Sequence, residues 1–121
     1  MLPRENRLKK EKDIKRALAG KIAAGGAALS LRAAATDLPA VRFCFVVSKR
    51  VSKKAPARNL VKRRLRAAAA ILMPRVVSGF DCAIIARPGA AGKDYRELAA
   101  EMERILAKSR LLAPPSSPKK F

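Results

Sequence analysis

The pattern of apolar positions along the chain predicts three strands. Residues 41–48 and 80–86 are β-branched and aromatic runs of strand length. Continuous apolar character is typical of strands that are buried on both faces, so both runs are predicted to be central strands. In residues 29–32, Leu29 and Leu31 alternate with Ser30 and Arg32, as in a strand with one buried face.

Helical spacing marks two further segments. Residues 7–20 predict a short amphipathic helix, because Ile14 and Leu18 lie four positions apart and Gly20 stands where a helix would stop. Residues 58–73 predict a second helix that Pro74 ends. Its predicted buried stripe is Val61, Leu65, Ala68 and Leu72.

A third helix begins near Asp94, where Glu97 follows three positions later as in a capping box. Its apolar stripe, predicted to pack on a sheet, is Tyr95, Leu98, Met102, Ile105 and Leu106. The chain of 121 residues is predicted to be one domain over 1–112. Residues 113–121 are rich in proline and serine and are predicted to be a disordered basic tail.

Charge narrows the class of partner. The chain has 28 Lys or Arg against 9 Asp or Glu, a formal charge of +19, which a polyanion would offset. No apolar run approaches the roughly 20 residues that span a bilayer, and we identify no targeting segment. We therefore expect a cytoplasmic protein that binds nucleic acid and neither a membrane nor a small-molecule substrate.

The sequence contains few side chains that could act in catalysis or bind a metal. There is no His, which excludes histidine acid–base catalysis. Glu97, Glu101 and Glu103 are predicted to form a solvated helix face rather than a metal site, since two carboxylates one turn apart lack further ligands. Cys44 and Cys82 lie in apolar strands and are predicted to be free core residues rather than a disulfide. We assign no catalytic or metal-binding residue.

The middle helix is the strongest candidate for a binding surface. Arg58, Lys62 and Arg66 share one face, with Asn59 and Arg63 on its flank. Solvated helix faces normally interleave acidic residues, yet positions 38–80 hold eleven Lys or Arg and no Asp or Glu. Phosphates would supply the missing counter-charge, so nucleic acid is preferred to a merely solvated face.

The stretch SKRVSKKAPARNLVKRRLR, residues 48–66, resembles the signature of the bacterial ribonuclease P protein component. Residues 7–18 and 81–106 extend the resemblance to the first helix and to the last strand and helix of that family. It implies an α/β domain, a two-layer α+β sandwich ordered αβββαβα, with an unusual left-handed βαβ crossover. It also implies that an RNA subunit with bound Mg²⁺ removes the 5′ leader of precursor tRNA, while the protein assists and holds no cofactor of its own.

The resemblance implies two RNA-binding surfaces. Contacts to the catalytic RNA map to Lys49, Arg50, Lys53, Lys54, Arg58, Asn59, Lys62, Arg63 and Arg66. A cleft for the single-stranded leader of precursor tRNA maps to Ile14, Leu18, Leu31, Ser48 and Arg87.

This sequence departs from the family pattern in three places. Leu60 stands where Arg is usual, with Arg64 as a partial substitute for its charge. Ile14, Leu18 and Leu31 stand where aromatic residues are usual, and for Ile14 and Leu18 a core role is the alternative. Pro56 lies in the connector, so the basic helix is expected to begin at or after it.

Two other classes of protein compete. A structural RNA-binding protein, such as a small ribosomal protein, would have the same composition but not the basic Arg-Asn-x-Val-Lys-Arg helix between two strands. A protein-only nuclease would need converging carboxylates. The nine acidic residues are scattered along the chain and do not indicate such a cluster.

Overall fold

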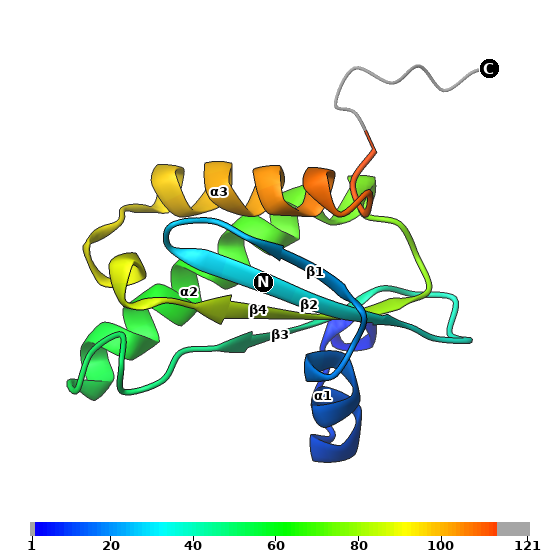
Figure 1. The fold of residues 1–121 in the computed structure, drawn as a ribbon, viewed down its shortest axis with the longest axis horizontal. Coiled ribbons are helices and arrows are strands. Elements are labelled where there is room, and N and C mark those ends of the chain that lie inside the picture. Colours follow the sequence, from blue (N-terminus) through cyan, green and yellow to red (C-terminus); the bar gives the residue numbers. More distant parts are fainter. Residues whose placement is uncertain (1, 114–121) are drawn as a thin grey trace.

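The computed structural model describes residues 2–113 and contains a four-stranded sheet with three helices (Figure 1). The elements are α1 (Glu11–Leu18), β1 (Ile22–Gly25), β2 (Leu29–Ala35), β3 (Arg42–Val46), α2 (Ala55–Leu72), β4 (Phe80–Ala86) and α3 (Tyr95–Lys108). The order αβββαβα is confirmed, although β1 has no propensity signal in its small residues.

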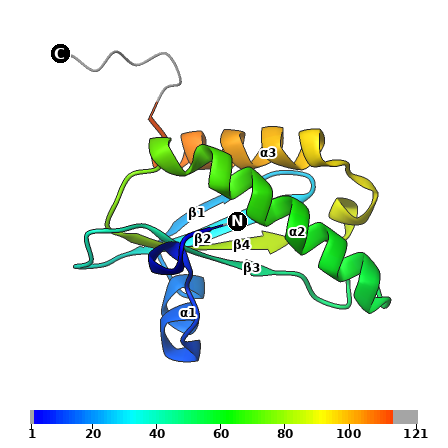
Figure 2. The same cartoon turned by 180° about the vertical axis from the view of Figure 1, so that it is seen from behind.

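The sheet order is β1-β2-β4-β3, with β3 parallel to β4 and the other pairs antiparallel. With α2 in front of the sheet and both strands pointing right, β4 lies above β3, so the β3–α2–β4 connection is left-handed (Figure 2). Helices α2 and α3 cover one face and α1 lies on the other (Figures 1 and 2). The fold is therefore the predicted two-layer sandwich with one additional helix on its second face.

One strand assignment was wrong. β4 is central, but β3 is an edge strand. Its apolar character has another cause: α2 covers one face, and the N-terminal segment covers part of the outer edge, where the Leu8 amide donates to the Phe43 carbonyl at 2.8 Å. An edge that the chain itself covers needs no polar protection.

The main core lies between the sheet and α2 and α3. Both predicted stripes face it, although Tyr95 is only partly buried. The α3 capping box is confirmed: the Glu97 amide donates to Asp94 at 2.9 Å, and the Asp94 amide donates to Glu97 at 3.1 Å. Helix α2 begins at Ala55, one residue before the predicted limit of Pro56, because proline is tolerated in the first turn.

The acidic face predicted for α3 is solvated only in part. Glu101 is 5% exposed, and its Oε2 accepts hydrogen bonds from the amides of Ala28 and Leu29 at 2.7 and 2.6 Å. The prediction was wrong for Glu101, since its carboxylate satisfies two amides at the β1–β2 turn. A Cβ on Gly26 would lie 2.4 Å from the same oxygen, so glycine is needed for this close approach.

Both thiols are free, as predicted. Cys82 faces the main core, whereas Cys44 faces the α1 side of the sheet in a smaller cluster with Leu8 and Ala17. Burial raises the pKa of Cys82 to about 12 and that of Cys44 to about 11. Both side chains are therefore protonated, unreactive packing groups at neutral pH.

The predicted tail boundary falls at the end of the described residues. Ala113 is still paired, because its amide donates to the Arg75 carbonyl at 2.8 Å and its carbonyl accepts from Arg75 Nε at 3.0 Å. The rest of the predicted disordered tail lies outside the described residues.

Candidate nucleic-acid interface

The connector after β3 and the outer side of α2 together form a cationic surface, here called the basic surface. Its members are Lys49, Arg50, Lys53, Lys54, Arg58, Asn59, Lys62, Arg63 and Arg66, all exposed or half-buried. The buried stripe through Val61 and Leu65 points the opposite way into the core. The structure thus places all nine predicted contacts to the RNA subunit on the connector and on α2, outside the buried stripe.

The charge of the basic surface is not neutralised within the fold. Of the eleven cations in positions 38–80, Arg42 pairs with Asp81 and Asp13, and Arg75 pairs with Glu103. Across residues 2–113, none of the other nine has a carboxylate oxygen within 4.0 Å. The expectation of uncompensated charge therefore holds for nine side chains rather than eleven.

Two arginines of α2 are fixed by backbone carbonyls. Arg58 Nη1 donates to the Ser52 carbonyl at 2.9 Å, which ties the start of α2 to the connector. Arg64 Nη1 donates to the Lys93 carbonyl at 2.7 Å, which directs its guanidinium toward the turn before α3. Leu60 is 37% exposed, so an apolar side chain interrupts the cationic face.

The second candidate surface is the part of the sheet that α1 leaves uncovered, here called the open face. It presents half-exposed residues of β2, β3 and β4, namely Ser30, Arg32, Val46 and Ile85. Ser48 and Arg87 are exposed just beyond the ends of the parallel strands β3 and β4, and Arg87 Nη1 donates to the Gly26 carbonyl at 2.8 Å. These two predicted cleft residues therefore lie at the same end of the sheet.

The three apolar residues predicted for the leader cleft do not lie together. Ile14 packs in the small cluster beneath α1, and Leu18 is 36% exposed. Leu31 is fully buried in the main core, on the sheet face that α2 and α3 cover, so its assignment to the cleft was wrong. Strand alternation instead puts the neighbouring Arg32 on the open face.

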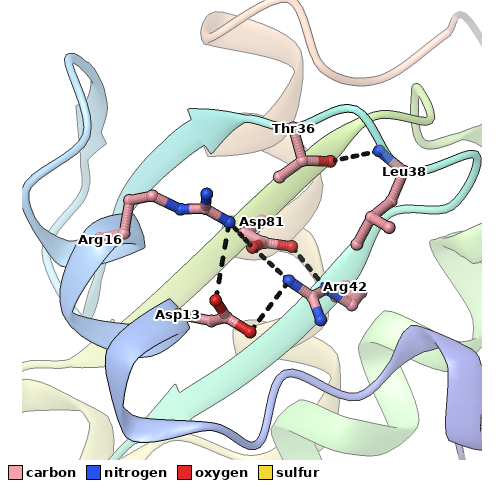
Figure 3. Close-up of polar contacts among 6 residues, drawn as sticks. All are labelled: Asp13, Arg16, Thr36, Leu38, Arg42 and Asp81. Atoms are coloured by element: carbon pink, nitrogen blue, oxygen red, sulfur yellow. Dashed lines mark hydrogen bonds and ion pairs between the residues drawn. The ribbon is translucent and has the colours of Figure 1, made fainter.

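An ion-pair network that sequence reasoning missed joins α1 to the sheet (Figure 3). Asp81 is fully buried and accepts from Arg42 Nε at 2.8 Å, Arg42 Nη2 at 2.7 Å and Arg16 Nη2 at 3.2 Å. Asp13 of α1 lies 3.5 Å from Arg42 and 3.8 Å from Arg16. The hydrogen bond with Asp81 raises the pKa of Arg42 above its ordinary value.

This network fixes the position of α1. A charge in the apolar strand that begins at Phe80 was the available signal, because a buried carboxylate requires a partner. Within residues 2–113 no three His, Cys, Asp or Glu side chains converge as metal ligands. No described helix is long and apolar enough to cross a membrane.

An α/β fold with one uncompensated cationic helix and an open sheet face is the arrangement expected of a small RNA-binding protein. The family model described as "Ribonuclease P" matches residues 2–110. The ribonuclease P protein component of Pseudanabaena is 34% identical and covers 93% of this chain and 97% of its own length. That of Picosynechococcus is 32% identical and covers 91% and 95%.

Two solved structures of ribonuclease P proteins have the same fold as this chain. The Staphylococcus aureus RNase P protein superposes with a TM-score of 0.80 at 20% identity, covering 88% of this chain and 97% of its own. The Thermotoga maritima protein gives 0.75 at 19% identity, covering 84% and 96%. The chain belongs to the ribonuclease P protein family. It is the protein subunit of an endoribonuclease holoenzyme that acts in tRNA 5′ processing, and its partner is the ribonuclease P RNA.

Proposed function

We propose that the RNA subunit carries the chemistry and that this chain binds RNA on two surfaces. The basic surface binds the ribonuclease P RNA, and the open face binds the single-stranded 5′ leader of precursor tRNA. Nine cations of positions 38–80 without an acidic partner among residues 2–113, eight of them in the basic surface, carry this proposal, because a bound polyanion would offset their mutual repulsion. The same role assigns the protein to the cytoplasm.

The donor set of the protein supports a Mg²⁺ site in the RNA rather than in this chain. Magnesium prefers carboxylate oxygens with open coordination positions. The most buried carboxylates are already engaged: Asp81 by two arginines, and Glu101 by two backbone amides. These residues do not fit a catalytic Mg²⁺ site, so hydrolysis by the holoenzyme is assigned to metal bound by RNA.

The open face favours a leader contact that depends on charge and apolar packing. Its strand residues include Arg32, Val46 and Ile85. None of the residues that the structure places on this face is aromatic. Base stacking on aromatic rings contributes about 1–3 kcal/mol per base where it occurs. Without it, the open face should hold the leader through its phosphates and with little preference for base identity.

Reconstitution tests the proposal. Precursor tRNA cleavage is measured with protein alone, with ribonuclease P RNA alone, and with both, over a range of Mg²⁺ concentrations. We expect no cleavage by protein alone, and we expect the protein to lower the Mg²⁺ concentration that the RNA requires. Mg²⁺-dependent cleavage by RNA-free protein would contradict the assignment of chemistry to the RNA.

A further inference from the structure

A cavity of about 490 Å³ lies along the outer edge of β3, between the N-terminal segment of residues 2–9 and α2. Its volume is within the roughly 300–1,000 Å³ range of small-ligand sites. The residues that line it include the apolar Leu8 and Ile14, the aromatic Phe45, and the cations Arg7, Lys9 and Arg66. The cavity therefore combines a flat apolar surface with three positive charges.

Phe45 supplies the flat surface. Its ring is half-buried and lies parallel to that of Phe43, with an interplanar angle of 7° and centroids 6.2 Å apart. Phe43 itself is 2% exposed, so it supports Phe45 from within the core. An aromatic ring held rigid by a second ring is a suitable platform for stacking a base.

The strand edge adds polar groups. The Phe43 carbonyl points outward and accepts from the Leu8 amide. Strand periodicity directs the N–H and C=O of Phe45 the same way, where the edge faces the cavity. A base stacked on Phe45 would meet a donor and an acceptor at its rim.

The charges connect this cavity to the basic surface. Among residues 2–113, no carboxylate oxygen lies within 4.0 Å of Arg7, Lys9 or Arg66. Arg66 follows Arg58 and Lys62 at intervals of one helical turn. An RNA strand that follows this row of cations along α2 reaches the cavity at Arg66.

We propose that the cavity holds one unstacked nucleotide of the ribonuclease P RNA, its base against Phe45 and its phosphate among Arg7, Lys9 and Arg66. This inference rests on the proposed binding of that RNA by the basic surface. The leader is the less suitable occupant, because Ile14 is the only predicted cleft residue in the wall, whereas Arg66 belongs to the basic surface.

Paired substitutions test the proposal. Phe45→Leu removes the aromatic face while keeping an apolar side chain, and Lys9→Gln removes one exposed charge at the rim. Phe80→Leu and Lys12→Gln are matched controls, since Phe80 is a partly buried core phenylalanine and Lys12 an exposed lysine, neither in the cavity wall. Each variant is assayed for melting temperature, for affinity to ribonuclease P RNA, and, as holoenzyme, for affinity to precursor tRNA.

We expect Phe45→Leu to weaken binding of ribonuclease P RNA by about fivefold or more, and Lys9→Gln to weaken it and to flatten its salt dependence. The controls should stay within about twofold. Unchanged affinity for both RNAs would overturn the proposal. A loss confined to precursor tRNA would also overturn it, because the cavity would then hold the leader.

A second measurement leaves the protein unaltered, in case Phe45→Leu destabilises the fold. Ribonuclease P RNA containing 4-thiouridine is irradiated with the wild-type protein, and cross-links are localised by peptide mass spectrometry. We expect adducts at Cys44 or Phe45, and their absence alongside adducts on α2 would overturn the inference alone. If Arg63→Gln on the basic surface also leaves RNA affinity unchanged, the proposed function fails with it.

Discussion

Asp81→Asn should cost about 3 kcal/mol of unfolding free energy. Asp81 is fully buried and accepts three hydrogen bonds from Arg42 and Arg16. Breaking a buried ion pair from one side costs roughly 3–5 kcal/mol. The lower end applies here, because Arg42 keeps Asp13 at 3.5 Å. For a chain of this size, the melting temperature should fall by about 10–15 °C.

Function should change in a specific way in the same variant. The network holds α1 against the sheet face opposite α2 (Figures 2 and 3). Asp81→Asn should therefore weaken precursor tRNA binding by the holoenzyme, while affinity for ribonuclease P RNA stays within about twofold of wild type. Arg16→Gln should cost less than about 1 kcal/mol, since the Arg16 side chain is 53% exposed.

Thermal melts and two RNA-binding titrations measure these effects below the melting temperature of each variant. Asp37→Asn is the matched control, because Asp37 is an exposed turn residue with no ion pair among residues 2–113. A melting temperature for Asp81→Asn within about 2 °C of the control would refute the assignment of the network as the anchor of α1.

Three further predictions concern packing and pH. The pKa of Cys44 is raised to about 11 and that of Cys82 to about 12 in the folded chain, whereas an unfolded thiol has a pKa near 9. Above pH 9 the unfolded chain is therefore deprotonated at these thiols while the folded chain still holds the protons. Unfolding free energy should therefore fall by about 1.4 kcal/mol per pH unit per thiol from pH 9 toward the folded pKa. Urea titrations should show a shallower fall in each Cys→Ala variant, and a pH-independent stability would contradict this. Leu31→Ala should cost about 2–5 kcal/mol, whereas Leu18→Ala should leave the melting temperature nearly unaltered; equal melting shifts would contradict the assigned burial. Glu101→Ala should cost about 2–4 kcal/mol in urea unfolding, because two buried amides lose their acceptor, and a loss below about 1 kcal/mol would contradict that role.

The positions of the helices and strands along the chain could be predicted better than the order of the strands in the sheet. The α2 stripe and the α3 capping box could be predicted, because helix periodicity and capping are local. The edge position of β3 could not, since an apolar run looks the same whether a second strand or the N-terminal segment covers its edge. The left-handed crossover came only from the family resemblance, as the general expectation is the opposite hand.

The candidate sites divide in the same way. The basic surface follows from spacing along one helix and from the absence of acidic residues in positions 38–80. The open face depends on which strands are neighbours, so Arg32 and the Asp81 network were missed. Leu31 could have been excluded from the alternation of residues 29–32 alone, because that pattern already directs it toward the core.

The proposed function depends most on the binding of ribonuclease P RNA phosphates by the basic surface. The direct test is the salt dependence of the dissociation constant for that RNA, compared between wild type and a double Arg63→Gln, Arg66→Gln variant. Both side chains are exposed, and each phosphate contact contributes about 0.7–0.9 to the log–log slope.

A double Lys12→Gln, Lys108→Gln variant is the control, because it removes the same charge from exposed positions outside the basic surface. We predict that the α2 variant lowers the slope by about 1.4–1.8 while the control leaves it nearly unchanged. Equal slopes for the wild type and the α2 variant, or an equal reduction in the control, would contradict the claim.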